Sequence, residues 1–253
     1  MNHPLGLKLW STNENYIKPA LNLYDKGFFQ YIELYSIPDS YENFSSLWKN
    51  IDIPFQIHGP HFKEGVNFAL KEKEEFNKKQ AEEALRFADL LKADWVIFHP
   101  GVSGDIHEAG RQLKSLADQR ILIENKPYYS TDGKWICNGA SFDEISTVLQ
   151  ETGYQFCLDF GHATCAANAL KIDPFEFINK MISLDPALYH LTDGDYNSIY
   201  DRHDHFGKGS FPIQKFLQMI PDGKCITNES YKDSKENLDD FEKDIVYLKI
   251  LMD

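Results

Sequence analysis

Hydrophobic and polar positions along the chain divide it into two kinds of segment. Short apolar runs, rich in β-branched and aromatic residues, alternate with longer stretches that mix charged and apolar positions. Uninterrupted apolar runs of this length are typical of strands buried on both faces of a parallel sheet. The pattern predicts eight strands, at residues 7–11, 31–36, 53–59, 95–101, 121–126, 155–162, 188–194 and 224–230.

The stretches between these runs have helical character. The clearest is 71–92, where Ala84, Leu85, Ala88 and Leu91 share one face and charged residues cover the other. Ser141, with Glu144 three residues later, is a typical helix start. The pattern predicts the other helices at roughly 14–27, 41–49, 105–118, 141–152, 174–183, 211–219 and 234–250.

Eight alternating strand and helix segments in 253 residues give about 32 residues per unit (253/8). This is the size of one strand plus a returning helix. The sequence therefore predicts the α/β class and a single (β/α)8 TIM barrel domain over residues 1–253. The alternative is an open doubly wound sheet, which is less favoured because no GxGxxG motif follows the first strand.

Residues of the types that bind metal ions recur at the ends of the predicted strands. In barrels of this kind the functional side chains sit at the carboxyl ends of the strands, so the fold brings them to one rim. Five of the nine histidines fall on this rim. The candidate ligands are His58, His99, Glu124, Asp159, His162, His190, Asp201, His203 and Glu229.

The charges of this set indicate what it binds. Four carboxylates this close together cannot all ionise without a counter-charge. Imidazole together with carboxylate suits zinc first, with manganese or iron as alternatives. Nine ligands are too many for one ion and fit two or three divalent ions per chain. Three divalent ions against four carboxylates leave a net charge of about +2, which suits an anionic substrate.

Composition limits the partners and the compartment. The chain has 26 Lys+Arg against 39 Asp+Glu, a formal net charge of −13. This charge disfavours duplex DNA and anionic membranes, and favours an anionic small molecule or a substrate of the sugar-phosphate type. No apolar run is long enough to span a bilayer, and no basic-then-apolar leader is present. The four cysteines form no CxxC pair, so we expect reduced thiols and a cytoplasmic protein.

The strand-end motifs also carry a family resemblance. The runs IHGPHF, FHPG, IEN, LDFGHA, HLTD, DRHDHFGKG and NES resemble those of the endonuclease IV family (AP endonuclease family 2), within the xylose isomerase-like barrels. The resemblance implies a (β/α)8 barrel, a three-metal site on the nine residues above, and cleavage of a phosphodiester beside an abasic site in DNA. The chain departs from the family in the acidic loop SIPDSYENFSS and in His61, which stands in place of a tyrosine. We therefore expect a substrate smaller than duplex DNA.

Three hypotheses follow. In the first, the protein is a metal-dependent phosphoester hydrolase: Glu124 bridges two ions, Glu229 binds metal and orients the nucleophile, and the substrate contacts are His61, Lys126 and Lys208. In the second, it is a sugar or sugar-phosphate isomerase or epimerase. One divalent ion is then held by Glu124, Asp159, His190 and Glu229, and the two glutamates form the acid–base pair. In the third, the barrel binds metal or sugar for a partner without catalysis. The sequence does not indicate the oligomeric state.

Overall fold

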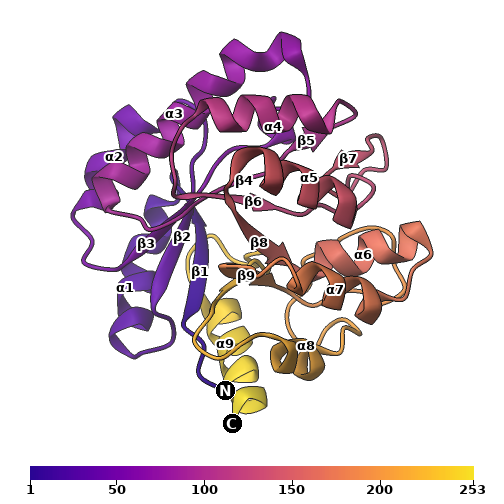
Figure 1. Ribbon diagram of the computed structural model, residues 1–253. Helices are drawn as coiled ribbons and strands as arrows, with labels where there is room; N and C mark the ends of the chain where they lie inside the picture. The colour runs from indigo at the N-terminus through magenta and orange to yellow at the C-terminus, as the bar shows by residue number, and fades with distance from the viewer.

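Eight parallel strands close into a barrel in the computed structural model, which describes residues 1–253 (Figure 1). Around the ring the order is β1, β10, β9, β8, β6, β4, β3, β2. The closed ring confirms the predicted (β/α)8 barrel and excludes the open sheet. The barrel strands are β1 (Leu5–Trp10), β2 (Tyr31–Tyr35), β3 (Phe55–His58), β4 (Val96–Phe98), β6 (Ile121–Glu124), β8 (Gln155–Asp159), β9 (Leu188–Leu191) and β10 (Cys225–Asn228).

Helices follow the strands and surround the ring (Figure 1). None of them is long and apolar enough to cross a bilayer. The predicted start of one helix is confirmed: the Ser141 hydroxyl accepts from the Glu144 amide, and the Glu144 carboxylate accepts from the Ser141 amide. The helices are α1 (Ile17–Asp25), α2 (Tyr41–Lys49), α3 (Glu74–Leu91), α4 (Ile106–Ser115), α5 (Phe142–Thr152), α6 (Phe160–Leu170), α7 (Pro174–Ile182), α8 (Ile213–Met219) and α9 (Asp239–Met252).

The predicted strand at 155–162 is wrong over its last three residues. β8 ends at Asp159, and α6 begins at Phe160. The Asp159 carboxylate accepts a hydrogen bond from the His162 amide at 2.7 Å, which caps the helix. The alanine-rich sequence that follows favours helix. Two helices, α6 and α7, therefore follow β8 where the repeat predicted one, and the second half of LDFGHA lies in the first turn of α6.

Other predicted boundaries also shift. The run 95–101 contains the short strand β4, while Gly101 belongs to a separate antiparallel pair that the sequence did not predict. This pair is formed by β5 (Gly101–Val102) and β7 (Cys137–Asn138). The last helix was expected to begin at residue 234 and begins at Asp239. The loops between strands and helices are thus longer on the carboxyl side of the barrel than the pattern indicated.

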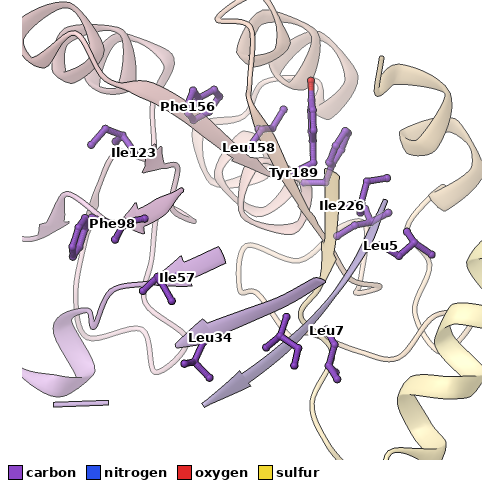
Figure 2. Packing of buried hydrophobic residues seen from close by; sticks show 14 of the residues in the cluster. Leu5, Leu7, Leu34, Ile57, Phe98, Ile123, Phe156, Leu158, Tyr189 and Ile226 are labelled. Atoms are coloured by element: carbon purple, nitrogen blue, oxygen red, sulfur yellow. The ribbon is translucent and has the colours of Figure 1, made fainter. Parts of the chain in front are cut away.

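The main hydrophobic core lies between the strands and the helices. Alternate strand residues such as Leu7, Leu34, Ile57 and Phe156 are fully buried and belong to one large cluster with helix side chains. Figure 2 shows these side chains around the outside of the ring of strands. The intervening residues point into the barrel, because successive strand side chains face opposite sides.

The barrel interior has an apolar part and a polar part. Ile97, Leu122, Cys157 and Leu188, on four adjacent strands, form a small apolar cluster of their own. The remaining strands carry buried polar side chains at their inward positions instead: Lys8, Tyr31, Glu33, Gln56 and Thr227. A polar interior of this kind requires hydrogen-bond partners for every group, and these partners connect it to the carboxyl end of the barrel.

Candidate metal centre

The nine predicted ligands all lie at the carboxyl end of the barrel. His58, Glu124 and Asp159 are the last residues of their strands, and His99 and Glu229 directly follow theirs. His190 lies within β9, His162 in the first turn of α6, and Asp201 and His203 in the loop after β9. All except His203 and Glu229 are in the most buried class of residues. Contacts between their side chains join them into one cluster.

Glu124 is the centre of this cluster. Its Oε2 atom lies 2.9 Å from Nε2 of His58 and 2.6 Å from Nε2 of His99. Its Oε1 atom faces the other side, 3.2 Å from Nδ1 of His162 and 3.4 Å from Nδ1 of His190. Burial alone would raise the pKa of Glu124, but the surrounding histidines hold it well below its usual value. The carboxylate is therefore ionised and presents one oxygen to each side.

A second group consists of His162, Asp201 and His203. Oδ2 of Asp201 lies 2.5 Å from Nε2 of His203 and 3.6 Å from Nε2 of His162. Burial acts to lower the pKa of His203, but Asp201 outweighs it and raises that pKa to about 9. His203 has a φ of 51°, in the left-handed region that a non-glycine residue seldom adopts. The loop thus holds this imidazole in place against a backbone cost.

A third group brings carboxylates together. Nδ1 of His190 lies 2.8 Å from Oε1 of Glu229, and Asp159 lies 3.8 Å from the His162 ring. Burial and the nearby negative charge of Glu229 raise the pKa of Asp159, although His162 opposes this. Carboxylates that repel one another in a buried space are stabilised by a cation.

The imidazole rings are held in defined tautomers. His58, His162 and His203 each place Nδ1 within 2.7–3.2 Å of a backbone carbonyl oxygen. A carbonyl oxygen only accepts hydrogen bonds, so Nδ1 carries a proton and Nε2 is the nitrogen that faces the cluster. His190 is reversed: its Nε2 lies 2.9 Å from the Glu33 carboxylate, and its Nδ1 faces the cluster. Anchoring one ring nitrogen in this way is typical of metal-binding histidines.

Several atoms of the cluster lack the partners that buried polar atoms normally have. Oε1 of Glu124 and Nδ1 of His190 are buried and make no hydrogen bond, although each lies close to other electron-pair donors. Groups of three donors converge within 4.8 Å of one another, among them His58–His99–Glu124 and His162–Asp201–His203. Unpartnered donor atoms that converge in this way, from imidazole and carboxylate, fit divalent ions such as zinc, manganese or iron.

Two residues of this region were missed by the sequence analysis. Lys8 and Glu33 lie inside the barrel, one layer below the strand ends, and Lys8 makes ion pairs with both Glu33 and Glu229. Their signal was present in the alternation of LKLW and YIELY, where a charged residue stands between two apolar ones. Both positions lie deeper in the barrel than the strand ends, where the ligands were predicted.

The predicted substrate contacts differ in their surroundings. His61, in the loop after β3, stacks on His99 with ring centroids 5.4 Å apart. Lys126, two residues after β6, is only 7% exposed, and its ammonium group makes no ion pair or hydrogen bond. Its charge acts on the pKa values of His61, His99 and Asp201, so it lies near the cluster. Lys208 is exposed and its side chain has no partner.

Known proteins share the fold and part of the sequence of this chain. A probable endonuclease 4 from Thermoplasma volcanium is 25% identical over 181 residues, which is 66% of this chain and 62% of that protein. The chain thus spans about three fifths of the length of this relative. The crystal structure of endonuclease IV from Thermus thermophilus superposes with a TM-score of 0.67 at 20% identity, covering 98% of this chain and 99% of that one.

A second solved structure is also similar in fold. A D-tagatose 3-epimerase-like protein gives a TM-score of 0.72 at 18% identity and covers 97% of this chain and 96% of that one. Both structures share the barrel. The family model described as xylose isomerase-like TIM barrel (AP_endonuc_2) matches residues 24–250, nearly the whole chain. This protein therefore belongs to the xylose isomerase-like TIM barrel family.

Proposed function

We propose that the protein is a metal-dependent phosphoester hydrolase with two or three divalent ions, zinc first among the candidates. The observation that carries this proposal is the position of Glu124, whose Oε2 faces His58 and His99 while its Oε1 faces His190, beside Glu229. A carboxylate with ligands on both sides is suited to join two ions. A site for a single ion does not require the further group of His162, Asp201 and His203.

The residues have separate roles in this proposal. The ions, when bound, would lower the pKa of a coordinated water and stabilise the charge on a phosphoryl group. His58, His99 and Glu124 would hold one ion, and His162, Asp201 and His203 another. Asp159, His190 and Glu229, with the second oxygen of Glu124, would hold a third. Glu229 faces this space from β10 and would orient the attacking group, as Glu124 does from β6.

An anionic substrate is favoured by the charges around the site. Lys126 is buried beside the cluster without an ion-pair partner, so a phosphate oxygen could pair with it. His61 and Lys208 lie in the loops after β3 and β9, at the same end of the barrel. The chain as a whole carries −13, and residues 36–46, which include the start of α2, contain no basic residue. Both features oppose the binding of a long polyanion. A small phosphodiester, or a short strand, therefore fits the face better than duplex DNA.

A second candidate is a sugar or sugar-phosphate isomerase or epimerase. The observation that favours it is the common orientation of Glu124 and Glu229, whose Oε1 atoms lie 3.4 and 2.8 Å from the same ring nitrogen of His190. With Asp159 these residues could hold one ion, and the two glutamates could exchange a proton with a bound sugar. This candidate leaves His58, His99 and the Asp201–His203 pair without a role.

The number of ions per chain separates the two candidates. Elemental analysis of the protein purified without chelator should give two or three ions for a hydrolase and about one for an isomerase. The metal-loaded protein is then tested on small phosphodiesters, on an oligonucleotide with an abasic site, and on ketose and aldose sugars. Hydrolysis that Glu124→Gln abolishes would support the first candidate.

The matched control is Asp118→Asn. Asp118 pairs with Arg120 just before β6, at the opposite end of the barrel from the metal centre. This variant should have the ion content and the activity of the wild type. Turnover of a sugar with one ion bound, and no phosphodiester cleavage, would replace the first candidate by the second.

A further inference from the structure

We infer that Glu33 is a positioning residue that makes His190 coordinate through Nδ1, while Lys8 fixes Glu33 relative to Glu229. The inference rests on the metal-binding part of the proposed function and not on the reaction catalysed. Glu33 touches none of the reacting groups. Its effect is transmitted through the ring of His190, whose Nε2 atom it contacts.

The contact spans the inside of the barrel. Glu33 lies on β2 and His190 on β9, with β1 and β10 between them in the ring. Oε2 of Glu33 lies 2.9 Å from Nε2 of His190, and both side chains have no exposed surface. The same oxygen accepts from the Thr227 hydroxyl at 2.7 Å, and Thr227 is in turn 2.8 Å from the Tyr31 hydroxyl. The carboxylate is thus fixed from two sides.

The geometry determines which nitrogen of His190 is free. An ionised carboxylate only accepts hydrogen bonds, so Nε2 of His190 must donate a proton to Glu33. Lys8 and the Thr227 hydroxyl both contact the Glu33 carboxylate, as groups that pair with its ionised form do. Nδ1 is then the ring nitrogen that faces Glu229 and Glu124 and is the one that can bind an ion. His190 would therefore bind an ion through the opposite nitrogen to that of His58, His162 and His203.

Lys8 completes the arrangement. Its ammonium group lies 3.2 Å from Oε1 of Glu33 and makes a short ion pair with Oε1 of Glu229. Because the charges of Lys8 and Glu33 are opposite, the two residues together do not change the net charge of the site. Glu33 and Glu229, which converge with His58, are thus both paired with Lys8. Both oxygens of Glu33 therefore have partners, and Glu33 acts on the ion only through His190.

Loss of the Glu33 carboxylate should lower the affinity for one ion and not for the others. An outer carboxylate that orients a ligand histidine typically contributes about 10- to 100-fold to metal affinity. The ions held by the other histidines keep their backbone carbonyl anchors, which a side-chain substitution does not remove. Glu33→Gln should therefore weaken a single ion by about 10- to 100-fold and leave the remaining ion content unchanged.

The test measures zinc per chain at a series of buffered free zinc concentrations. Wild type, Glu33→Gln and the control Glu83→Gln are compared, with thermal unfolding as a check that each is folded. Glu83 is a largely buried glutamate that accepts from the amides of Asp39 and Tyr41 and touches no ligand. We expect the control to follow wild type and Glu33→Gln to lose one ion in the range where wild type is saturated. Coincident curves for all three proteins would overturn the inference.

A second readout does not depend on stability. Long-range proton–nitrogen spectra of the zinc-loaded protein with labelled histidine distinguish rings bound through Nδ1 from those bound through Nε2. Wild type should contain one ring bound through Nδ1 with its proton on Nε2, and the signal of this ring should change in Glu33→Gln. If every ring binds through Nε2, Glu33 does not have this role. Wild type that binds no zinc overturns the proposed function and this inference together, whereas wild type that binds zinc but cleaves no phosphoester overturns only the former.

Discussion

Oε2 of Glu124 on β6 lies 2.6 Å from Nε2 of His99, which follows β4, the neighbouring strand in the barrel. Both side chains are buried, and the His99 ring has no other polar partner because its Nδ1 makes no hydrogen bond. This contact is one of the few that balance the charge of Glu124. Two buried electron-pair donors at this distance are suited to share a cation.

Removal of metal should therefore destabilise the protein. Ions that bind the folded chain and not the unfolded chain stabilise it, by about 2.7 kcal/mol per site at a free concentration of 100 times Kd. We expect the midpoint of thermal unfolding to fall on treatment with a chelator and to recover when zinc is added. Unchanged unfolding with and without chelator, in protein that is shown to have lost its ions, would contradict a centre that balances buried carboxylates.

The stability of the metal-free protein should decrease as the pH rises from about 7 to 8. His203 has a folded pKa of about 9, raised by Asp201 against the effect of burial, while the unfolded value is about 6.5. The folded chain then binds more protons than the unfolded chain in this interval, so the free energy of unfolding falls with pH. The pKa of His190 is also raised, which acts in the same direction.

Urea unfolding in the presence of chelator at several pH values measures this slope. The interval begins at pH 7 because His61 and His99, whose pKa values are lowered, change the stability mainly at more acidic pH. The interval ends at pH 8 because Lys232 has a lowered pKa of about 8, and above that pH its titration makes the free energy of unfolding rise with pH. Zinc should remove the decrease, since a coordinated imidazole no longer exchanges a proton. A free energy of unfolding that rises from pH 7 to 8 would contradict the prediction.

Replacing Lys8 alone should lower the free energy of unfolding more than replacing Lys8 and Glu33 together. Lys8→Met leaves Glu33 buried without its cation, and breaking a buried ion pair from one side costs about 3–5 kcal/mol. In the double variant Lys8→Met/Glu33→Gln the charge of Glu33 is removed as well and only Glu229 loses its lysine partner, so the loss should be smaller. Free energies of unfolding of the wild type, both single variants and the double variant give the coupling. Strictly additive losses would show that the two side chains do not act as a pair.

Lys126 should contribute to the binding of an anionic substrate. A charge-assisted hydrogen bond contributes about 1.5–3 kcal/mol, so Lys126→Met should lower kcat/KM for a phosphoester by about 10- to 100-fold. Lys208→Met is the comparison, because an exposed lysine contributes at most about 1 kcal/mol. Metal content of both variants is measured to show that the ions remain. Equal, small effects of the two substitutions on kcat/KM would show that Lys126 does not contact the substrate.

Much of the fold and of the site follows from local patterns in the sequence. Strands buried on both faces produce continuous apolar runs, and a helix must return the chain between parallel strands, so the repeat length indicates the barrel. A barrel places all strand ends on one rim, and this is why His58, Glu124 and Asp159 could be grouped although they are far apart in sequence. The motif DRH added Asp201 and His203 to the same set.

What the pattern did not predict depends on contacts between distant segments. Asp159 ends β8 because its carboxylate caps α6, and a strand pattern cannot show where a cap forms. The pairing of β5 with β7 involves only two residues on each strand, too few for periodicity.

The sequence by itself determined the barrel and the residue types at its rim, because both depend on local periodicity and on the closure of the ring. Only the tertiary structure decided which nitrogen of each histidine faces the centre. That choice depends on a hydrogen bond from the other nitrogen to a group distant in sequence: Glu33 and His190 are 157 residues apart. The sequence also does not show whether an inward charge such as Lys8 has a partner, because that depends on distances across the barrel.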